Sequence, residues 1–133
     1  MVDCWKNDAI SLVEAFRSGE RTPEDETQAV LSAIEKSSLN AFSYIDKEGA
    51  LLRAENADVS LPLGGVPIAV KELHNVDGWP DTGASLVFKD RISQFDGTMI
   101  QRLKAAGANL IGLTTASEFG GLNCSTTKLN GIT

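Results

Sequence analysis

The sequence predicts an α/β fold, and the strongest observation is a strand, helix, strand pattern between residues 66 and 113. Residues 66–71 and 109–113 are apolar runs typical of strands in a sheet that is covered on both faces. Between them lies a helical pattern that starts at the expected cap Asp96 and stops at Gly107. Its apolar residues Met99, Ile100, Leu103 and Ala106 lie on one face, as expected for a helix packed against a sheet. This order is a βαβ unit, whose right-handed crossover makes the two strands parallel.

The first 58 residues predict a helical hairpin, one strand and one further helix. The first helix is amphipathic: Ile10, Val13 and Phe16 form its apolar face, which we expect to be buried, and Gly19 stops it. Thr22 followed by Pro23 is a typical helix start, and we expect the second helix to bury Val30, Leu31 and Ile34. Residues 41–45 then predict a strand, and residues 51–58 predict the end of a third helix.

No repeat or low-complexity linker interrupts the chain, so we expect residues 1–133 to form one continuous piece. Residues 75–93 are rich in Gly, Asp and Pro and predict an ordered loop with at most a short strand. Pro67 has no N–H for a strand ladder and indicates the beginning of a strand or a sheet edge. A chain of this length buries roughly two thirds of the surface that it exposes when unfolded.

Composition excludes several classes of function. The 12 Lys and Arg against 18 Asp and Glu give a net charge of −6, which disfavours binding to nucleic acids or to anionic membranes. No apolar run approaches the roughly 18 residues of a membrane span, and the first residues lack a secretory pattern. Cys4, Cys124 and the single histidine do not form a metal-binding pattern. We therefore expect a cytoplasmic protein with reduced thiols, no metal and no cofactor.

Lys71 is the first candidate for chemistry, because it ends an otherwise apolar strand and ligands of α/β sheets bind beyond such ends. A desolvated lysine there would be a neutral amine that serves as base or nucleophile. The alternative is that the strand ends at water and Lys71 is its first exposed residue. Glu72 counts against deprotonation, since a neighbouring carboxylate favours the ammonium form.

Other polar residues have a structural interpretation beside the chemical one. His74 could shuttle protons, but no nucleophile motif accompanies it, so a loop hydrogen bond is the simpler interpretation. Residues 82–85 offer hydroxyl groups near a ligand or simply fill a turn. Residues 114–121 also follow a strand, and Thr115 or Ser117 could cap a short helix there.

Six segments carry a more specific pattern: 17–24, 39–42, 63–72, 78–85, 103–108 and 112–121. In this order and at these intervals they resemble the amidase signature family of serine amidohydrolases. The resemblance runs from about Asp8 to Thr133 and is most specific at residues 63–72, which read LGGVPIAVKE. It implies the N-terminal part of an amidase-signature fold, with a helical hairpin followed by βαβ elements of a mixed, largely parallel sheet covered by helices.

The resemblance also implies an activity and a site. In that family the lysine ending the G-x-P-x-x-V-K strand is the base, a role that falls on Lys71, and it acts through a cis-peptide serine on a nucleophilic serine. The loop of Glu118, Phe119 and Gly120 would border the cleft for a small-molecule amide. No cofactor is implied, and a homodimer is left open. Glu72 departs from the family, in which Asp is usual at that position.

Neither catalytic serine is identifiable, because no serine here lies in a GGSSGGS-like context. We therefore expect residues 1–133 to be the N-terminal portion of a single amidase domain, truncated before the Gly/Ser-rich signature. As an isolated chain it should be inactive, and insoluble or partly unfolded. The alternative function is a non-catalytic α/β binding or regulatory module derived from an amidase.

Overall fold

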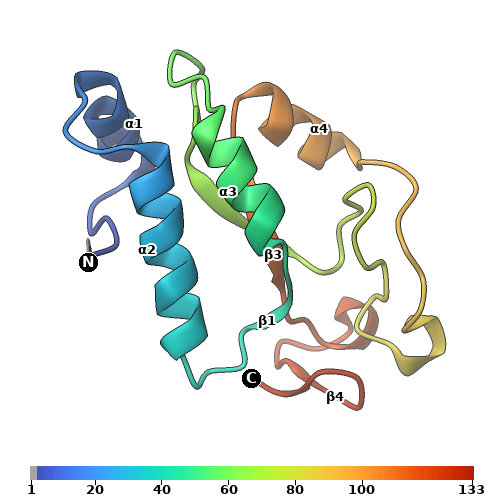
Figure 1. Cartoon of the computed structure of the whole chain (residues 1–133). Coiled ribbons are helices and arrows are strands. Elements are labelled where there is room, and N and C mark those ends of the chain that lie inside the picture. The colour runs from blue at the N-terminus through green and yellow to red at the C-terminus, as the bar shows by residue number, and fades with distance from the viewer. Residues whose placement is uncertain (1–2) are drawn as a thin grey trace. The chain divides into compact units, whose positions relative to one another are not determined.

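A computed structural model describes residues 3–133 (Figure 1). These residues form two compact units. Unit 1 comprises the residues up to Ser37 together with Asp46–Ile68 and Arg102–Ile111. Unit 2 comprises Ser38–Ile45, Ala69–Gln101 and Gly112–Thr133. Each unit is thus assembled from three separate stretches of chain.

The order of elements confirms the α/β prediction. Along the chain the elements are α1 (Ala9–Ser18), α2 (Pro23–Lys36), β1 (Phe42–Ile45), α3 (Lys47–Glu55), β2 (Pro67–Lys71), the 3-10 turn η1 (Leu86–Phe88), α4 (Thr98–Ala105), β3 (Asn109–Thr114), the 3-10 turn η2 (Glu118–Gly120), β4 (Thr126–Thr127) and β5 (Gly131–Ile132). Each helix and strand expected from the sequence is present, and the third helix ends slightly before the expected boundary.

Helix α1 contributes most of a small apolar core in unit 1. Leu12, Val13 and Phe16 pack with Val66, and Trp5, Val59 and Ile68 lie against this cluster. The expectation that Ile10 is buried is wrong, because its side chain is 74% exposed. Since a helix turns 100° per residue, a buried face centred between Leu12 and Phe16 points away from position 10.

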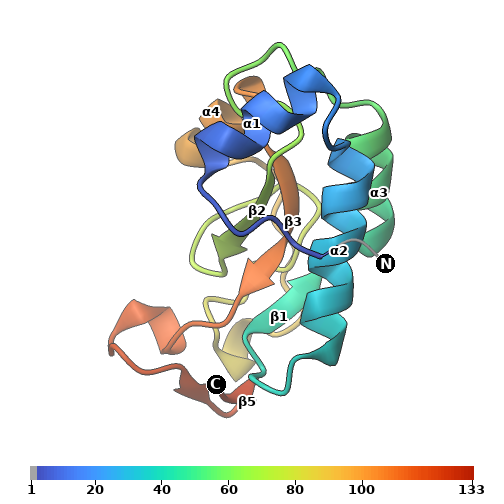
Figure 2. The same cartoon turned by 90° about the vertical axis from the view of Figure 1, so that its left-hand side faces the viewer.

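Helix α2 begins as predicted, with the Thr22 side chain accepting a hydrogen bond from the N–H of Asp25 at 3.1 Å. Leu31 is buried, whereas Val30 and Ile34 are only half-buried. Glu26 is also buried, and it pairs with Arg21 at 2.5 Å. Helices α2 and α3 lie side by side in unit 1 (Figures 1 and 2).

The main sheet has the strand order β1-β3-β2 and is mixed. Strand β1 runs antiparallel to β3, with Tyr44 opposite Leu113. Strand β2 runs parallel to β3: the Val66 carbonyl accepts from the N–H of Asn109 at 2.8 Å, and the N–H of Glu72 donates to the Thr114 carbonyl at 3.0 Å. The predicted βαβ unit is therefore confirmed.

Strand β2 lies at an edge of this sheet, which explains Pro67. Within the described residues it is not covered on both faces as expected, since only Val70 is buried while Ala69 and Lys71 are exposed. Strand β3 is central, and all of its residues except Thr114 are buried. The apolar sequence thus predicted the strand correctly. It did not predict whether both faces of the strand are buried, because that depends on which other segments pack against them.

Helix α4 starts at Thr98, two residues after the expected cap. Asp96 accepts a hydrogen bond from the N–H of Asp77 at 2.9 Å. Ile100 is buried, but Met99 is 43% exposed, so the expected burial of Met99 is wrong. Met99 lies one residue before Ile100, and a helix turns about 100° per residue, so the Met99 side chain points away from the buried face of the helix. The helix is followed by Gly107, whose φ of 87° is left-handed, as its sequence position predicts.

Unit 2 is built largely from loops around the C-terminal halves of β2 and β3. Residues 72–97 contain one isolated bridge, between Pro80 and Ile92. The rings of Tyr44 and Trp79 lie 5.2 Å apart between centroids, with a tilt of 57° between their planes, and β4 pairs antiparallel with β5. Among residues 3–133, every helix is too short or too polar to cross a lipid bilayer.

Candidate active site

Lys71 is the last residue of β2, and its side chain reaches the segment that follows β3. Because β2 and β3 are parallel neighbours, their carboxyl ends share one edge of the sheet. The Lys71 Nζ donates a hydrogen bond to the carbonyl of Thr115, the first residue after β3. The sequence placed Lys71 at a strand end correctly, and the structure shows which backbone group it meets.

The Lys71 side chain is exposed in the part of the chain that the structure describes. This agrees with the alternative in which the strand ends at water and Lys71 is its first exposed residue.

Glu72 is a buried carboxylate with only 3% of its surface exposed. Its Oε1 accepts from the backbone N–H of Ala116 at 2.5 Å, and the Asn130 side-chain amide donates to Oε1 and Oε2 at 2.9 and 3.0 Å. These bonds compensate for the loss of water around the charge. Glu72 thereby ties β2 to the segment after β3 and to the β4–β5 hairpin.

The segment of Glu118, Phe119 and Gly120 forms η2, and residues 82–88 hold it. Phe119 has a left-handed φ of 53°, a rare conformation for a bulky residue. Its N–H donates to the carbonyl of Gly83 at 2.8 Å, and its ring meets the ring of Phe88 edge-on at 6.0 Å. The buried Ser85 hydroxyl donates to Glu118 Oε1 at 2.5 Å.

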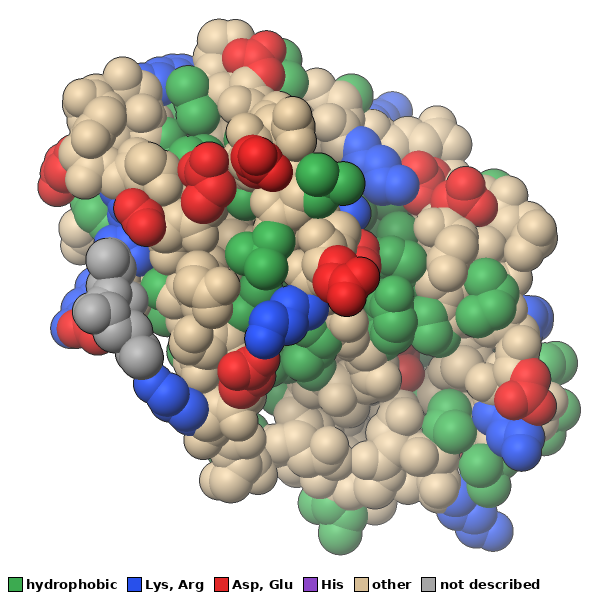
Figure 3. Space-filling view, viewed as in Figure 1, with side chains coloured by type: hydrophobic (Ala, Val, Ile, Leu, Met, Phe, Trp, Pro, Cys, Tyr) green, Lys and Arg blue, Asp and Glu red, His purple; other side chains and the backbone are tan. Residues whose placement is uncertain are grey.

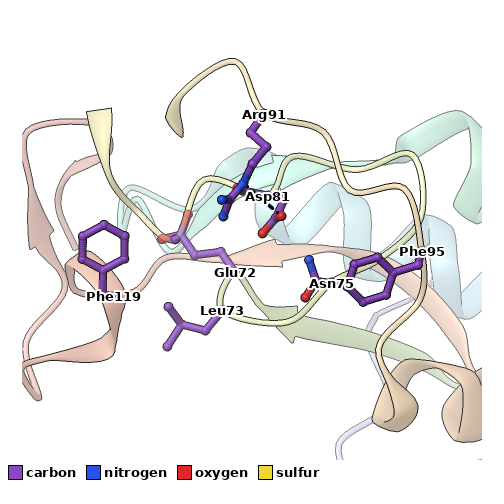
Figure 4. Close-up of a pocket in the computed structure, with 8 residues that line it drawn as sticks. Glu72, Leu73, Asn75, Asp81, Arg91, Phe95 and Phe119 are labelled. Atoms are coloured by element: carbon purple, nitrogen blue, oxygen red, sulfur yellow. Dashed lines mark hydrogen bonds and ion pairs between the residues drawn. The ribbon is translucent and has the colours of Figure 1, made fainter. Parts of the chain in front are cut away.

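Phe119 also borders a hollow of about 470 Å³ in unit 2 (Figure 4). Figure 4 shows Phe119 and Phe95 at opposite sides of this hollow, with Leu73 along one wall and Arg91 beside Asp81. Its other lining residues are Glu72, Asn75 and Gly83. Of the four site residues expected from the sequence, only Phe119 lines it; Lys71, Glu118 and Gly120 do not.

The polar side of the hollow contains one ion pair, between Arg91 and Asp81. The Arg91 Nε donates to the backbone carbonyl of Asp81 at 2.6 Å and lies 3.0 Å from its carboxylate. The guanidinium also stacks on the Phe88 ring at 4.3 Å. Since Asp81 balances Arg91, this side of the hollow offers hydrogen-bonding groups without an excess positive charge.

The remaining polar candidates have structural partners or lie in solvent. His74 is exposed, and its backbone N–H closes a turn on the carbonyl of Lys71. Ser117 exchanges two hydrogen bonds with the backbone of Leu122 and does not cap η2, while the Thr115 hydroxyl contacts that of Thr133 at 2.7 Å. Among the described residues, no group of three His, Cys, Asp or Glu side chains could hold a metal ion.

The model of the family described as "Amidase" matches residues 25–133, most of the chain. The chain belongs to the amidase family. Its curated relatives include two glutamyl-tRNA(Gln) amidotransferase subunits A. The subunit from Methylacidiphilum infernorum is 46% identical over 79 residues, which are 59% of this chain. The subunit from Streptomyces coelicolor is 35% identical over 128 residues, which are 90% of this chain.

Solved amidase-family structures share the same fold. The structure of 6-aminohexanoate cyclic dimer hydrolase matches with a TM-score of 0.89 and 26% identity, covering all of this chain and 28% of the hydrolase. The chain spans 16% of the Methylacidiphilum relative and 26% of the Streptomyces relative. It therefore corresponds to about a quarter of a typical amidase in length.

Sequence reasoning missed the hydrogen bonds that join Glu72 to Ala116 and to Asn130. The sequence indicates only that Glu72 places a charge next to Lys71 and replaces the usual Asp, and it gives no sign of Asn130. One signal was available in the sequence, because the oppositely charged Lys71 and Glu72 follow an apolar run. Successive side chains of an extended chain point to opposite sides, so these two charges should meet different partners. Finding Asn130 from sequence was not feasible, because it lies 58 residues away from Glu72.

Proposed function

We propose that this chain is the N-terminal portion of an amidohydrolase in which Lys71 is the catalytic base. The observation that carries the proposal is the position of Lys71 at the shared carboxyl edge of β2 and β3, with Nζ on the Thr115 carbonyl. Family membership supports amide hydrolysis as the reaction class. Both catalytic serines would come from polypeptide outside these 133 residues.

The proposed reaction is acyl transfer to a serine. A neutral Lys71 amine accepts the proton of a serine hydroxyl, directly or through a second serine, while the serine oxygen attacks the amide carbonyl. The amine or ammonia leaves, and water then hydrolyses the acyl-enzyme. Because Lys71 is exposed here, the polypeptide that supplies the serines must also remove water from its amine.

The proposed substrate is a small-molecule amide bordered by Glu118, Phe119 and Gly120. The apolar walls of Leu73, Phe95 and Phe119 favour an uncharged acyl group beside this segment. For the full-length protein we propose two possible assemblies. One is a homodimer, and the other is a complex with different subunits, by analogy with the amidotransferase subunits A. Sedimentation of the purified full-length protein distinguishes these arrangements.

The test starts with the coding DNA that follows the codon for Thr133. An in-frame continuation with a GGSSGGS-like stretch is expected, and in that longer protein Lys71→Ala should lower kcat for amide hydrolysis at least about a thousandfold. Lys89→Ala, which removes an exposed lysine of unit 2, serves as the matched control and should retain wild-type turnover. Wild-type turnover in Lys71→Ala would exclude Lys71 as the base.

The 133-residue chain alone should hydrolyse no amide. A stop codon directly after Thr133, with no amidase sequence beyond it, would favour the non-catalytic binding or regulatory module instead. Measurable amide hydrolysis by the chain alone would contradict the need for serines from further polypeptide.

A further inference from the structure

We propose that Glu72 is a positioning residue for Lys71 and acts through the single peptide group between Thr115 and Ala116. Two consecutive side chains of opposite charge hold this group from its two ends. The catalytic meaning of the arrangement rests on the proposed function of Lys71, whereas the arrangement itself is a property of unit 2.

The geometry of the peptide group explains how both side chains reach it. Lys71 Nζ donates to the carbonyl oxygen of Thr115, and the N–H of Ala116 donates to Glu72 Oε1 at 2.5 Å. The C=O and N–H of a trans peptide point in opposite directions, and successive side chains of extended chain leave it on opposite sides. Residues 71 and 72 therefore enclose one peptide group.

The charges make the two hydrogen bonds mutually supportive. A carboxylate that accepts from the N–H polarises the peptide and increases the negative charge on its carbonyl oxygen. That oxygen then binds the lysine amino group more strongly, because hydrogen bonds to charged or polarised groups are stronger than those between neutral groups. Burial of Glu72 to 3% exposure strengthens the effect by excluding water from the carboxylate.

Asn130 extends this connection to the C-terminal hairpin. Its side-chain amide contacts both Glu72 oxygens, and its backbone carbonyl accepts from the Asn40 side chain at 2.8 Å. The carboxylate is thus fixed from two sides, by Ala116 and by Asn130. When Lys71 acts as a neutral base, an N–H held on the Thr115 carbonyl would fix the direction of the nitrogen lone pair.

The test measures the reactivity of the Lys71 amine directly, in the full-length protein and without turnover. In Glu72→Gln the side chain keeps its shape and an acceptor oxygen but loses its charge. Wild type and variant are acetylated with limiting acetic anhydride at neutral pH, and each lysine is quantified by mass spectrometry. Lys71 should react about fivefold faster in the variant, because its bond to the Thr115 carbonyl is weakened.

Lys89 and Lys128 of the same molecules provide the internal reference, since both are exposed residues of unit 2. The matched control Asp90→Asn removes an exposed carboxylate from the same unit and should leave Lys71 reactivity unchanged. If Glu72→Gln does not fold, Asn130→Ala replaces it. This variant keeps the charge of Glu72 but removes the amide that holds its carboxylate in place. The acetylation rate of Lys71 should then rise about twofold.

Backbone amide exchange at Ala116 separates positioning from a purely structural role. Faster exchange at Ala116 together with faster acetylation of Lys71 supports the proposal. Faster exchange at Ala116 with wild-type acetylation of Lys71 would overturn it, because Glu72 would then hold the backbone only. Neither result depends on amidase activity. If Lys71 is not the catalytic base, this is detected separately, by wild-type turnover of Lys71→Ala.

Discussion

At the scale of single residues, Asn109 shows how one buried polar side chain organises unit 1. Its Nδ2 donates to the Thr27 hydroxyl and to the Ala50 carbonyl, both at 3.0 Å, and its Oδ1 accepts from the Arg53 Nε at 3.3 Å. These partners lie on α2 and α3, so the first residue of β3 connects both helices to the sheet. Only 2% of its surface is exposed.

Replacement of this residue, Asn109→Ala, should lower the free energy of unfolding by about 2–3 kcal/mol, because it leaves buried polar groups of α2 and α3 without a partner. Urea unfolding followed by circular dichroism measures the change. Asn123→Ala, at an exposed position, is the matched control and should stay within about 0.5 kcal/mol of wild type. Equal effects of both substitutions would show that the Asn109 hydrogen bonds do not stabilise unit 1.

At the scale of elements, α1 depends on the cap at its N-terminus. The Asp8 side chain accepts from the N–H of Ser11 at 2.8 Å, and this hydrogen bond lowers the pKa of Asp8 below its ordinary value of 3.8. A carboxyl group whose pKa is lowered in the folded state stabilises that state when it is ionised. Asp8 therefore supports α1 above about pH 4.

Acidification should weaken the start of α1 as Asp8 becomes protonated. The contribution is fully present above the unfolded-state pKa and is lost as the pH falls through the lower, folded-state pKa. Exchange of the Ser11 amide, measured from about pH 6 to about pH 2 and corrected for intrinsic rates, reports the loss. Asp8→Asn keeps a good cap that does not titrate. An equally steep pH dependence in that variant would rule out Asp8 as the cause.

At the scale of the whole molecule, exposed apolar side chains are distributed unevenly. Of the large hydrophobic side chains exposed among the described residues, eleven belong to unit 2 and two to unit 1. On the face in Figure 3, hydrophobic side chains reach the surface at several places, between dispersed basic and acidic ones. Unit 2 therefore has much apolar surface that the chain itself does not cover.

This surface should cause the purified chain to self-associate or to unfold partly at micromolar concentration. A variant carrying Leu122→Ser and Ile132→Ser, two of the most exposed apolar residues of unit 2, should associate less in size-exclusion chromatography with light scattering. Leu52→Ser, an exposed position of unit 1, is the control and should behave like wild type. A stable wild-type monomer with one sharp, cooperative thermal transition would contradict this prediction.

Local signals in the sequence predicted the elements well but their burial less well. Caps such as Thr22 and stops such as Gly107 act within a few residues, so their effect is readable from the chain alone. Ile10 and Met99 were expected to be buried and are exposed, because burial depends on which segment packs against a helix face. For the same reason the apolar sequence of β2 predicted a strand buried on both faces, although Ala69 is exposed.

The sequence by itself determined the amidase-like order of segments, the parallel βαβ unit and the place of Lys71 at the end of β2. Only the tertiary structure decided that Glu72 and Lys71 enclose the Thr115–Ala116 peptide and that Asn130 holds the carboxylate. The physical reason is range: strand and helix signals act between neighbours in sequence, whereas these contacts join residues more than 40 positions apart.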